Sequence, residues 1–338
     1  MNSRLQHETE KLTRSWTKHQ SAWLRDYLVA GVEDPRINLQ SILSRHFLAR
    51  EVLGERFHLL MEEEYRFAAV MNWLLELAKR PGSEELAVVL HALRHRADNA
   101  EGRPIPQFVL RTFATLPIAT IDYNVPNYVE SFLTGTEWVN GQLRIAEPLL
   151  NTFCDLWHGL LSGVTGTVPC SVLEPACGSA NDYRFLDTCG LDRLVDYTGF
   201  DLCAKNVENA LALFPSTRFR VGNVFAIDAP DKSFDLCVVH DLFEHLSLEG
   251  LARAVDEVCR VTRRGLCVGF FQMDERRDHV VRTVDEYHWN TLSLARVKEL
   301  FAGHGFAAQA IHIGTFLREK IGCEFTHNAN AYTLVLRS

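Results

Sequence analysis

Small residues form a turn near the middle of the chain whose composition suits ligand binding. Glu174 ends a short apolar run, and Ala176, Gly178 and Ala180 follow it, just before a helical pattern begins. Small residues let a ligand approach the backbone, and the helix would point its N-terminal N–H groups at that ligand. Taken alone, this succession of strand, turn and helix is a weak signal, because many α/β domains contain it.

Two further polar stretches follow the next apolar runs. Asp201 lies 23 residues after Gly178, close to the spacing of about 20 residues at which an acid accepts hydrogen bonds from ribose hydroxyls in nucleotide-binding folds. For Asp201 alone, an N-cap of the next helix is an equally good interpretation. After the third run, Asn223 can accept from an exocyclic amino group, the Val224 N–H can meet a ring nitrogen, and Phe225 can pack on a base. The three stretches in order favour a nucleotide-like ligand.

Hydrophobic periodicity predicts the elements that position these residues. From Cys170 onward, short apolar runs alternate with helical patterns, which is typical of a doubly wound, mostly parallel sheet of seven strands. Ligands bind at the carboxyl ends of such strands, so the three stretches would share one cleft. No helical pattern separates the last two runs, so we expect them to form an antiparallel hairpin at one edge. The expected strands are 170–174, 196–201, 217–221, 234–240, 265–272, 306–313 and 331–337, and the expected helices are about 181–189, 203–213, 248–262 and 293–304.

Residues 1–120 show helical periodicity instead. Their apolar stripes are most simply the core-facing sides of a helical bundle, with a lid over a substrate pocket or a dimer contact as alternatives. We therefore expect an α-helical N-terminal domain, residues 1–150, and a second domain, residues 151–338, with a boundary that the pattern places only within 120–165. Ser83 is the expected N-cap of one helix. The expected helices are 37–53, 57–78, 84–96, 107–116 and 145–161.

Composition limits the classes of partner and compartment. The chain has 338 residues and a net charge of −8, and neither half is basic, so no electrostatic footprint for nucleic acid is visible. Nine cysteines lie mostly inside apolar runs with no C-x-x-C pair, which favours buried thiols over disulfides or zinc. The N-terminus lacks the apolar segment of a signal peptide, and no run is long enough to span a membrane. We expect a soluble, cytoplasmic protein.

The segment from about 165 to 338 resembles the class I S-adenosylmethionine-dependent methyltransferases. That family has an acid before a glycine-rich turn, an acid ending the second strand, a G-D step, and a run of the form S-F-D-x-V-x-x-x-x-V-L-E-H-L. The matching residues here are Leu173-Glu174-Pro175-Ala176-Cys177-Gly178, Gly199-Phe200-Asp201, Gly222-Asn223 and, most specifically, Asp231 to Leu246; a later stretch, Tyr287 to Phe306, looks like the family's H-x-x-x-T/S…L-x-x-A-G-F segment.

This chain departs from the family pattern at three positions. Ala176 and Ala180 replace two of the three usual glycines, which is compatible with a ligand-binding turn provided that both keep negative φ. Asn223 replaces an aspartate and keeps an amide oxygen as acceptor.

The resemblance implies a role for each matched residue toward S-adenosyl-L-methionine. Glu174, Ala176 and Gly178 would hold the methionine part, Asp201 the ribose hydroxyls, and Leu202, Asn223, Val224 and Phe225 the adenine. His240 would lie near the methionine moiety and the substrate.

Other interpretations of the same residues are weaker. The run from His240 to His245 suggests a zinc site, but its spacing is H-x-x-x-E-H and it begins at a strand end, so we expect no metal. The thiol of Cys177 is more simply buried than nucleophilic. The turn is similar to that of DNA adenine methyltransferases, but the double proline those enzymes need after the fourth strand is missing.

Methyl transfer needs mainly alignment and desolvation, with a general base where the acceptor has a proton to lose. His240, Tyr287 and His288 are the candidate bases, while His245 is more simply structural.

The function we expect is methyl transfer to a small molecule, with substrate contacts from Tyr123, Asn127, Tyr128 and Trp138. The helical region would roof the pocket or form a homodimer contact. The alternatives are a protein or RNA methyltransferase, or a protein that binds the cofactor without transfer.

Overall fold

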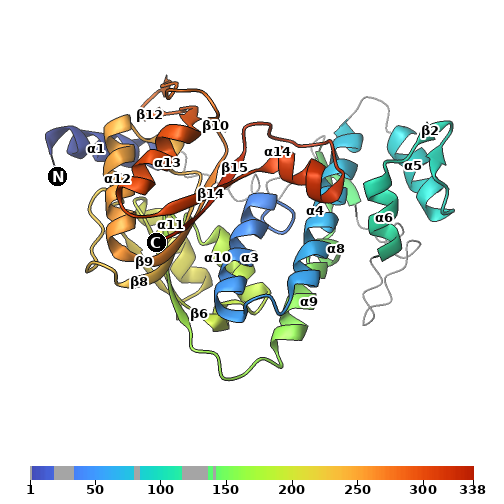
Figure 1. Cartoon of the computed structure of the whole chain (residues 1–338), viewed down its shortest axis with the longest axis horizontal. Helices are drawn as coiled ribbons and strands as arrows, with labels where there is room; N and C mark the ends of the chain where they lie inside the picture. The colour runs from blue at the N-terminus through green and yellow to red at the C-terminus, as the bar shows by residue number, and fades with distance from the viewer. Residues whose placement is uncertain (1, 19–33, 80–83, 116–135, 140–141) are drawn as a thin grey trace.

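The protein is represented by a computed structural model that describes residues 2–18, 34–79, 84–115, 136–139 and 142–338 (Figure 1). The proposed substrate-contact residues Tyr123, Asn127 and Tyr128, and the expected N-cap Ser83, lie outside the described residues, as does the side chain of Trp138.

A seven-stranded sheet organises the C-terminal half, in the order β14-β15-β9-β8-β5-β6-β7. The five strands from β9 to β7 are parallel, and β15 is antiparallel to both of its neighbours. The prediction of a mostly parallel, doubly wound sheet is confirmed. The strands are β5 (Cys170–Pro175), β6 (Val195–Asp201), β7 (Arg218–Val221), β8 (Phe234–His240), β9 (Thr262–Phe270), β14 (Ala307–His312) and β15 (Tyr332–Arg337).

The end of the chain differs from the expected edge hairpin. β14 and β15 do pair antiparallel, but β15 lies between β14 and β9, and a helical segment joins the two strands. This segment consists of α14 (Ile313–Phe316) and a π-helical turn (Leu317–Ile321). It buries only two side chains, those of Ile313 and Leu317, so its apolar pattern is too short to be recognised in the sequence.

Successive residues of the central strands point to opposite faces, and both faces are buried. Val172, Leu236 and Val238 belong to one core cluster, with the helices on that face. Leu173, Cys237 and Val239 belong to the other. The first face is covered by α3 (Leu39–Leu53), α10 (Asn181–Thr188) and α11 (Ala204–Leu213), and the second by α12 (Leu248–Val261) and α13 (Leu294–Gly303).

The N-terminal half is largely helical, as expected, with two short hairpins. Asn38 caps α3 by accepting from the N–H groups of Gln40 and Ser41, and the helix ends at Gly54, whose φ is 62°. The remaining elements are α1 (Ser3–Lys18), α4 (His58–Lys79), α5 (Glu84–Arg94), α6 (Gln107–Thr115), α8 (Glu147–Leu150) and α9 (Thr152–Leu161), with the hairpins β1 (Asn99–Ala100)–β2 (Arg103–Pro104) and β3 (Thr136–Val139)–β4 (Gln142–Ile145).

Two N-terminal helices pack directly on the sheet domain. The Gln40 amide of α3 donates to the carbonyls of Phe270 and Tyr332 at 3.0 and 2.9 Å, where β9 ends and β15 begins. Leu5 and Leu12 of α1 are buried in the core cluster of α12. Figure 1 shows α1 beside α12 at one end of the molecule, with α5 and α6 at the opposite end. The domain boundary near residue 150 stays a prediction.

A buried charge network holds α3 against α4 and α9. Glu64 accepts from Arg45 at 3.0 Å, from His46 at 2.6 Å and from Trp157 at 2.7 Å. All four side chains are at most 3% exposed. Burial alone would raise the pKa of Glu64, but His46, Arg45 and Trp157 outweigh it and lower that pKa to about 2. The network therefore keeps Glu64 ionised and fixes the register of α3.

All nine cysteines are buried and free, as expected of structural thiols. Within the part of the chain that the structure describes, no helix is both long and apolar enough to cross a membrane.

Candidate cofactor and methyl-transfer site

The turn after β5 adopts a left-handed backbone at all three small residues. φ is 56° at Ala176, 55° at Gly178 and 66° at Ala180. The expectation that both alanines keep negative φ is therefore wrong. The turn is held in this shape by β6, because the Cys177 N–H donates to the carbonyl of Phe200 at 3.1 Å. Its conformation is that of a glycine turn, so the two alanines are strained.

We expect replacement of Ala180 by glycine to stabilise the protein. An L-residue in the left-handed region costs roughly 1–2 kcal/mol, which glycine would relieve. The greater freedom of glycine in the unfolded chain and the loss of the buried Ala180 methyl group offset part of this relief, so the net gain should be up to about 1 kcal/mol. Urea unfolding measures the change. Ala212→Gly, on the exposed side of α11, is the matched control and should lose about 1 kcal/mol. If Ala180→Gly lost as much as Ala212→Gly, the strain would be refuted.

Asp201 ends β6 and ties three segments together. One carboxylate oxygen accepts from the Gly178 N–H at 3.0 Å, and the other accepts from the Cys203 N–H at 2.8 Å and from Asn206 at 3.2 Å. Asp201 therefore braces the turn and the start of α11, as its alternative interpretation anticipated, while remaining at the strand end next to Glu174. Burial raises its pKa despite these hydrogen bonds.

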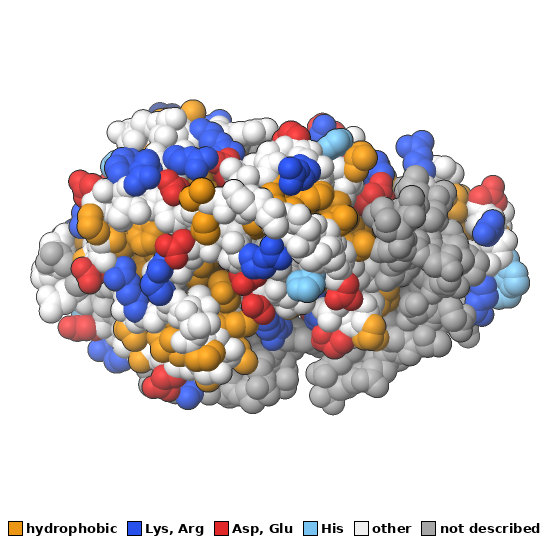
Figure 2. Space-filling model, turned by 90° about the horizontal axis from the view of Figure 1, so that it is seen from below, with side chains coloured by type: hydrophobic (Ala, Val, Ile, Leu, Met, Phe, Trp, Pro, Cys, Tyr) orange, Lys and Arg blue, Asp and Glu red, His pale blue; other side chains and the backbone are white. Residues whose placement is uncertain are grey.

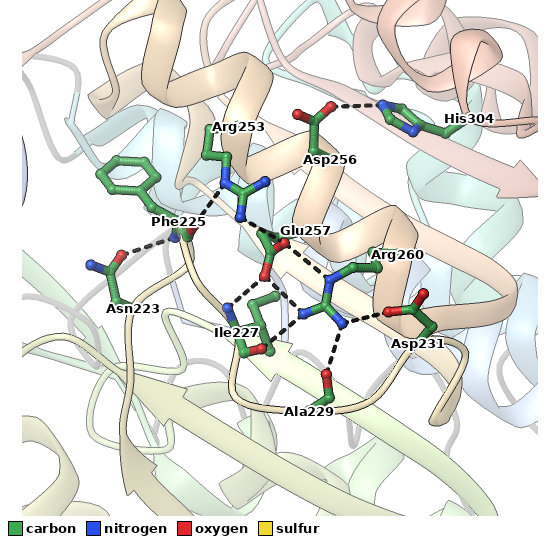
Figure 3. A network of polar contacts seen from close by, with 10 residues as sticks. All are labelled: Asn223, Phe225, Ile227, Ala229, Asp231, Arg253, Asp256, Glu257, Arg260 and His304. Carbon is green, nitrogen blue, oxygen red and sulfur yellow. Dashed lines mark hydrogen bonds and ion pairs between the residues drawn. The ribbon is translucent and has the colours of Figure 1, made fainter. Parts of the chain in front are cut away.

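The loop after β7 carries Asn223 and is clamped to α12 (Figure 3). Glu257, 4% exposed, accepts from the Ile227 N–H at 2.7 Å and from Arg260. Arg260 donates to the carbonyl of Ala229, and Arg253 donates to that of Phe225. Because the backbone of this loop is held at several points, the residues after Asn223 are fixed without a helix of their own.

The four residues expected beside the adenine differ in exposure. The Asn223 oxygen accepts from the Phe225 N–H at 2.9 Å (Figure 3). Its NH₂ group donates to Thr9 of α1 at 3.0 Å. Val224 and Phe225 are 9% and 1% exposed and belong to the core cluster of α12. Leu202 is partly exposed at the end of β6. Asn223 and Leu202 thus lie where a ligand can reach them. The Phe225 ring instead packs in the core beneath the loop.

His240 is joined to a helix of the N-terminal half. Its Nε2 lies 2.5 Å from Oγ of Ser44 on α3, and its Nδ1 lies 2.8 Å from a carboxylate oxygen of Asp182 on α10. Glu174, 5% exposed, accepts from the Tyr197 hydroxyl at 2.5 Å. These groups line a small cavity. Its lining residues are Ser41, Ser44, Arg45, Leu48, Val172, Glu174, Asp182, Leu186, Tyr197, Val238 and His240.

The charges of this cluster follow from burial and pairing. Burial would lower the pKa of His240, but Asp182 outweighs it and raises that pKa to about 9. Burial, helped by Asp182, raises the pKa of Glu174 to about 8. At neutral pH, His240 is therefore a cation paired with an anionic Asp182, and Glu174 keeps its proton.

We expect stability to fall as the pH rises from 7 to 9. The folded pKa of His240 lies above its ordinary 6.5, so its contribution is complete below pH 6.5 and is lost as the pH rises through 9, by on the order of 3 kcal/mol. Glu174 acts in the same direction between pH 4.5 and 8. Melting temperatures across this range check the effect, and His240→Gln should flatten the slope. His304→Gln, which breaks a surface pair with Asp256, should leave it unchanged, and an equal slope in all three proteins would contradict the assignment.

The other candidate bases lie on a separate short strand, and one of them, Tyr287, contacts an aromatic cluster around His245. Tyr287 and His288 form the short strand β12, which pairs with β11 (Thr283–Val284). Both side chains are partly exposed. The Nδ1 of His288 is buried and has no hydrogen-bond partner among the described residues. His245, at the end of a 3₁₀ turn (Phe243–His245), contacts Tyr287 with ring centroids 5.6 Å apart.

Known proteins resemble the chain in part. Residues 173–268 match a family model described as a methyltransferase domain. Among solved structures, the chain is similar to a Burkholderia thailandensis 1,6-didemethyltoxoflavin-N1-methyltransferase with bound 1,6-didemethyltoxoflavin and S-adenosylhomocysteine (14% identity, TM-score 0.38, 54% of this chain and 75% of that one).

Two other solved structures are similar to a comparable degree. One is an S-adenosylmethionine-dependent methyltransferase from Mesorhizobium loti (13% identity, TM-score 0.39, 54% and 97% of the two chains). The other is a protein from Pyrococcus horikoshii OT3 (18% identity, TM-score 0.39, 63% and 98%). A search of curated proteins found no match.

The family match and the strand order together define the class of the C-terminal half. It is a class I S-adenosylmethionine-dependent methyltransferase domain, an enzyme domain whose cofactor is S-adenosyl-L-methionine.

The residues at the strand ends fit that cofactor. Glu174 and Asp201 end neighbouring strands, and each carboxyl group has lone pairs left for further hydrogen bonds. A Cβ at Gly178 would meet only the side-chain nitrogen of Asn181, at 3.5 Å, so the space beside the turn is open. At Gly199 a Cβ would lie 2.9 Å from the Phe219 ring, which shows how closely the layer beneath is packed.

The cluster around His240 also contains potential metal ligands. Atoms of Glu174, Asp182 and His240 lie within 4.8 Å of one another. All three side chains have protein partners, however, and the raised pKa of Glu174 keeps it protonated, which disfavours a cation there. The absence of a metal stays a prediction.

Two residues of this cluster were not expected from the sequence. Asp182 lies in the first helical turn of α10, just after the small-residue turn. An acidic residue is common there because it interacts favourably with the helix dipole, so the sequence gives no separate sign of a site. Ser44 lies 196 residues from His240 in the chain, on a helix whose apolar stripe gives no sign of its contact with the sheet. Only the packing of α3 on β9 brings Ser44 to the site.

Proposed function

We propose that the protein transfers the methyl group of S-adenosylmethionine to a small-molecule acceptor bound at the carboxyl edge of the sheet. The observation that carries this proposal is the position of α1. Glu8 accepts from the N–H and the hydroxyl of Ser247 at 2.6 and 2.5 Å, and Thr9 accepts from Asn223. Helix α1 thus covers part of this edge. This cover would obstruct the approach of a polymer, whereas a small acceptor needs a smaller opening.

The surface charge supports the same class of acceptor. Figure 2 shows the face of the molecule that is seen from below in Figure 1. Lys and Arg side chains are interspersed with Asp and Glu over the described residues of this face, and no continuous basic tract is seen among them. A protein that neutralises phosphates needs clustered basic side chains. The net charge of −8 points the same way.

Each site residue then has a proposed role. Glu174, Gly178 and Asp201 hold the cofactor at the ends of β5 and β6, with Leu202 and Asn223 at its adenine end. When bound, the cofactor supplies an electrophilic methyl group. His240 is a poor general base at neutral pH, since both ring nitrogens are engaged and its raised pKa keeps it protonated. Its role is to hold Asp182 and Ser44 beside the methionine end.

A product assay over different acceptor classes tests the proposal. The full-length protein is incubated with S-adenosylmethionine and, separately, with small phenols, amines and thiols, with total RNA, or with a peptide library, and release of S-adenosylhomocysteine is measured. We expect turnover with a small molecule only. Turnover confined to RNA or peptides would overturn the small-molecule acceptor in favour of a polymer. Cofactor binding without any turnover would favour a non-catalytic binding protein.

A further inference from the structure

An aromatic cluster surrounds His245 at the carboxyl ends of β8 and β9. The ring centroid of His245 lies 5.3 Å from that of Phe271, 5.6 Å from that of Tyr287 and 5.4 Å from that of Trp289. Phe271 and Trp289 also meet each other, 4.9 Å apart and edge to face. Trp289 is 39% exposed, so the cluster reaches the surface. An array of this kind presents ring faces and edges to a planar ligand.

Two buried polar side chains fix the cluster in place. Glu244 is 0% exposed and accepts from the Phe271 N–H at 2.7 Å, which holds the segment after β9. Asn290 is also 0% exposed; its NH₂ group donates to the carbonyl of Leu246 at 2.7 Å, and its N–H donates to the carbonyl of Glu244. The rings therefore belong to a braced surface, which favours a binding role that needs defined geometry.

The protonation of His245 follows from one hydrogen bond. Its Nδ1 lies 3.1 Å from the backbone carbonyl of His288, which can only accept, so Nδ1 carries the proton. Burial lowers the pKa of His245, so the ring is neutral at neutral pH and its Nε2 keeps a lone pair. Among the described residues, no hydrogen bond to that Nε2 is found. His245 thus has the free basic nitrogen that His240 lacks.

Two glutamates next to the cluster offer no free negative charge. Glu244 accepts through Oε1 from the N–H groups of Phe271 and Gln272, its Oε2 is buried without a hydrogen-bond partner among the described residues, and burial raises its pKa well above the ordinary value, so it keeps its proton. Glu286 faces Arg14 of α1 at 3.6 Å. A cationic acceptor would find no dedicated counter-charge in these two residues. The cluster therefore suits an uncharged aromatic acceptor better than an amine.

Its place in the sheet is also suitable. β8 lies directly beside β5, and the carboxyl ends of these parallel strands share an edge. Glu174 and the small-residue turn end β5, and the segment that holds His245 follows β8. An acceptor lying on the cluster would adjoin the methionine end of the cofactor.

We infer that His245, within the cluster of Phe271, Tyr287 and Trp289, is the proton acceptor of the reaction and that the acceptor is an aromatic molecule with an ionisable hydroxyl group. This inference rests on the proposed function. In the step, the acceptor oxygen forms a bond to the methyl carbon, the carbon–sulfur bonding pair stays on sulfur, and the hydroxyl proton passes to Nε2 of His245. The products are the methyl ether, the neutral thioether and an imidazolium, so atoms and charge balance.

Two variants of the full-length protein test the two parts of this inference. His245→Gln should lower kcat for weakly acidic phenols by about 100-fold or more, the usual contribution of a general base. For 4-nitrophenol at a pH where it is ionised, the loss should be much smaller, because no proton has to be removed. Trp289→Ala should raise KM for aromatic acceptors several-fold with little change in kcat. His304→Gln, at the exposed C-cap of α13, is the matched control and should change neither constant.

Binding measurements separate failure of this inference from failure of the proposed function. Both variants should bind S-adenosylhomocysteine as the wild type does, which also shows that they are folded. A wild type that binds neither S-adenosylhomocysteine nor S-adenosylmethionine overturns the proposed function. If the wild type binds the cofactor, the inference is overturned when His245→Gln lowers kcat equally for ionised and un-ionised phenols. It is also overturned when His245→Gln leaves kcat unchanged for both. The inference is overturned as well if no phenol is methylated and 2-naphthol does not quench Trp emission in a Trp289-dependent way.

Discussion

Glu64→Gln should reduce the free energy of unfolding by about 3–5 kcal/mol, the cost of breaking a buried ion pair from one side. Glu64 is 0% exposed and is the acceptor for Arg45, His46 and Trp157. A neutral amide at position 64 would leave the Arg45 guanidinium buried without a counter-charge. The NH₂ group of that amide would also face N–H groups that can only donate, so a hydrogen bond would be lost. Urea denaturation of the full-length protein measures the loss.

The matched control is Glu62→Gln, an exposed position on the same helix, where a change within about 0.5 kcal/mol is expected. The pH dependence adds a second check. The folded pKa of Glu64, about 2, lies below its ordinary 4.5, so its contribution is complete above pH 4.5 and is lost as the pH falls through 2. A loss below 1 kcal/mol in Glu64→Gln would show that the network does not fix α3.

Asp201→Ala should abolish the stabilisation that S-adenosylhomocysteine gives to the wild type. The substitution removes the acceptor for the N–H groups of Gly178 and Cys203 together with the proposed ribose ligand. Hydrogen bonds to a charged group contribute roughly 1.5–3 kcal/mol each, so we expect cofactor affinity to fall by about 100-fold or more. The measurement is the melting temperature with and without S-adenosylhomocysteine.

A matched substitution on the same strand separates the site from the fold. Asp196 lies near the start of β6 and forms an exposed pair with Arg218. Asp196→Ala should keep the full ligand-induced rise in melting temperature, because exposed pairs add little to stability and this one is at the far end of the strand. If Asp201→Ala kept the same rise as Asp196→Ala, Asp201 would have no part in cofactor binding.

Much of the C-terminal half could be predicted from the sequence because its signals are local. Each strand is a short apolar run and each helix has one buried stripe, so β5 to β9 and α10 to α13 lie within a few residues of their expected bounds. The positions of α1 and α3 could not be predicted. Their stripes show that one face of each helix is buried but not what covers it, and contacts such as Gln40 with Tyr332 join residues far apart in the chain.

The site was predictable to the same extent. Glu174 and Asp201 lie at the carboxyl ends of β5 and β6, and Asn223 follows β7, so their common edge follows from the parallel sheet alone. The backbone of the turn and the protonation of the two histidines could not be read in the same way. Both depend on neighbours: β6 holds the alanines in the left-handed region, Asp182 keeps His240 charged, and the carbonyl of His288 sets the tautomer of His245.

Titration calorimetry of the full-length protein with S-adenosylmethionine and S-adenosylhomocysteine measures directly whether the edge formed by β5, β6 and β7 binds the cofactor. We expect one site per chain for both compounds, with binding weakened about 100-fold or more in Asp201→Ala and unchanged in Asp196→Ala. A wild-type protein that shows no binding of either compound would contradict the assignment of the β5–β6–β7 edge as the cofactor site.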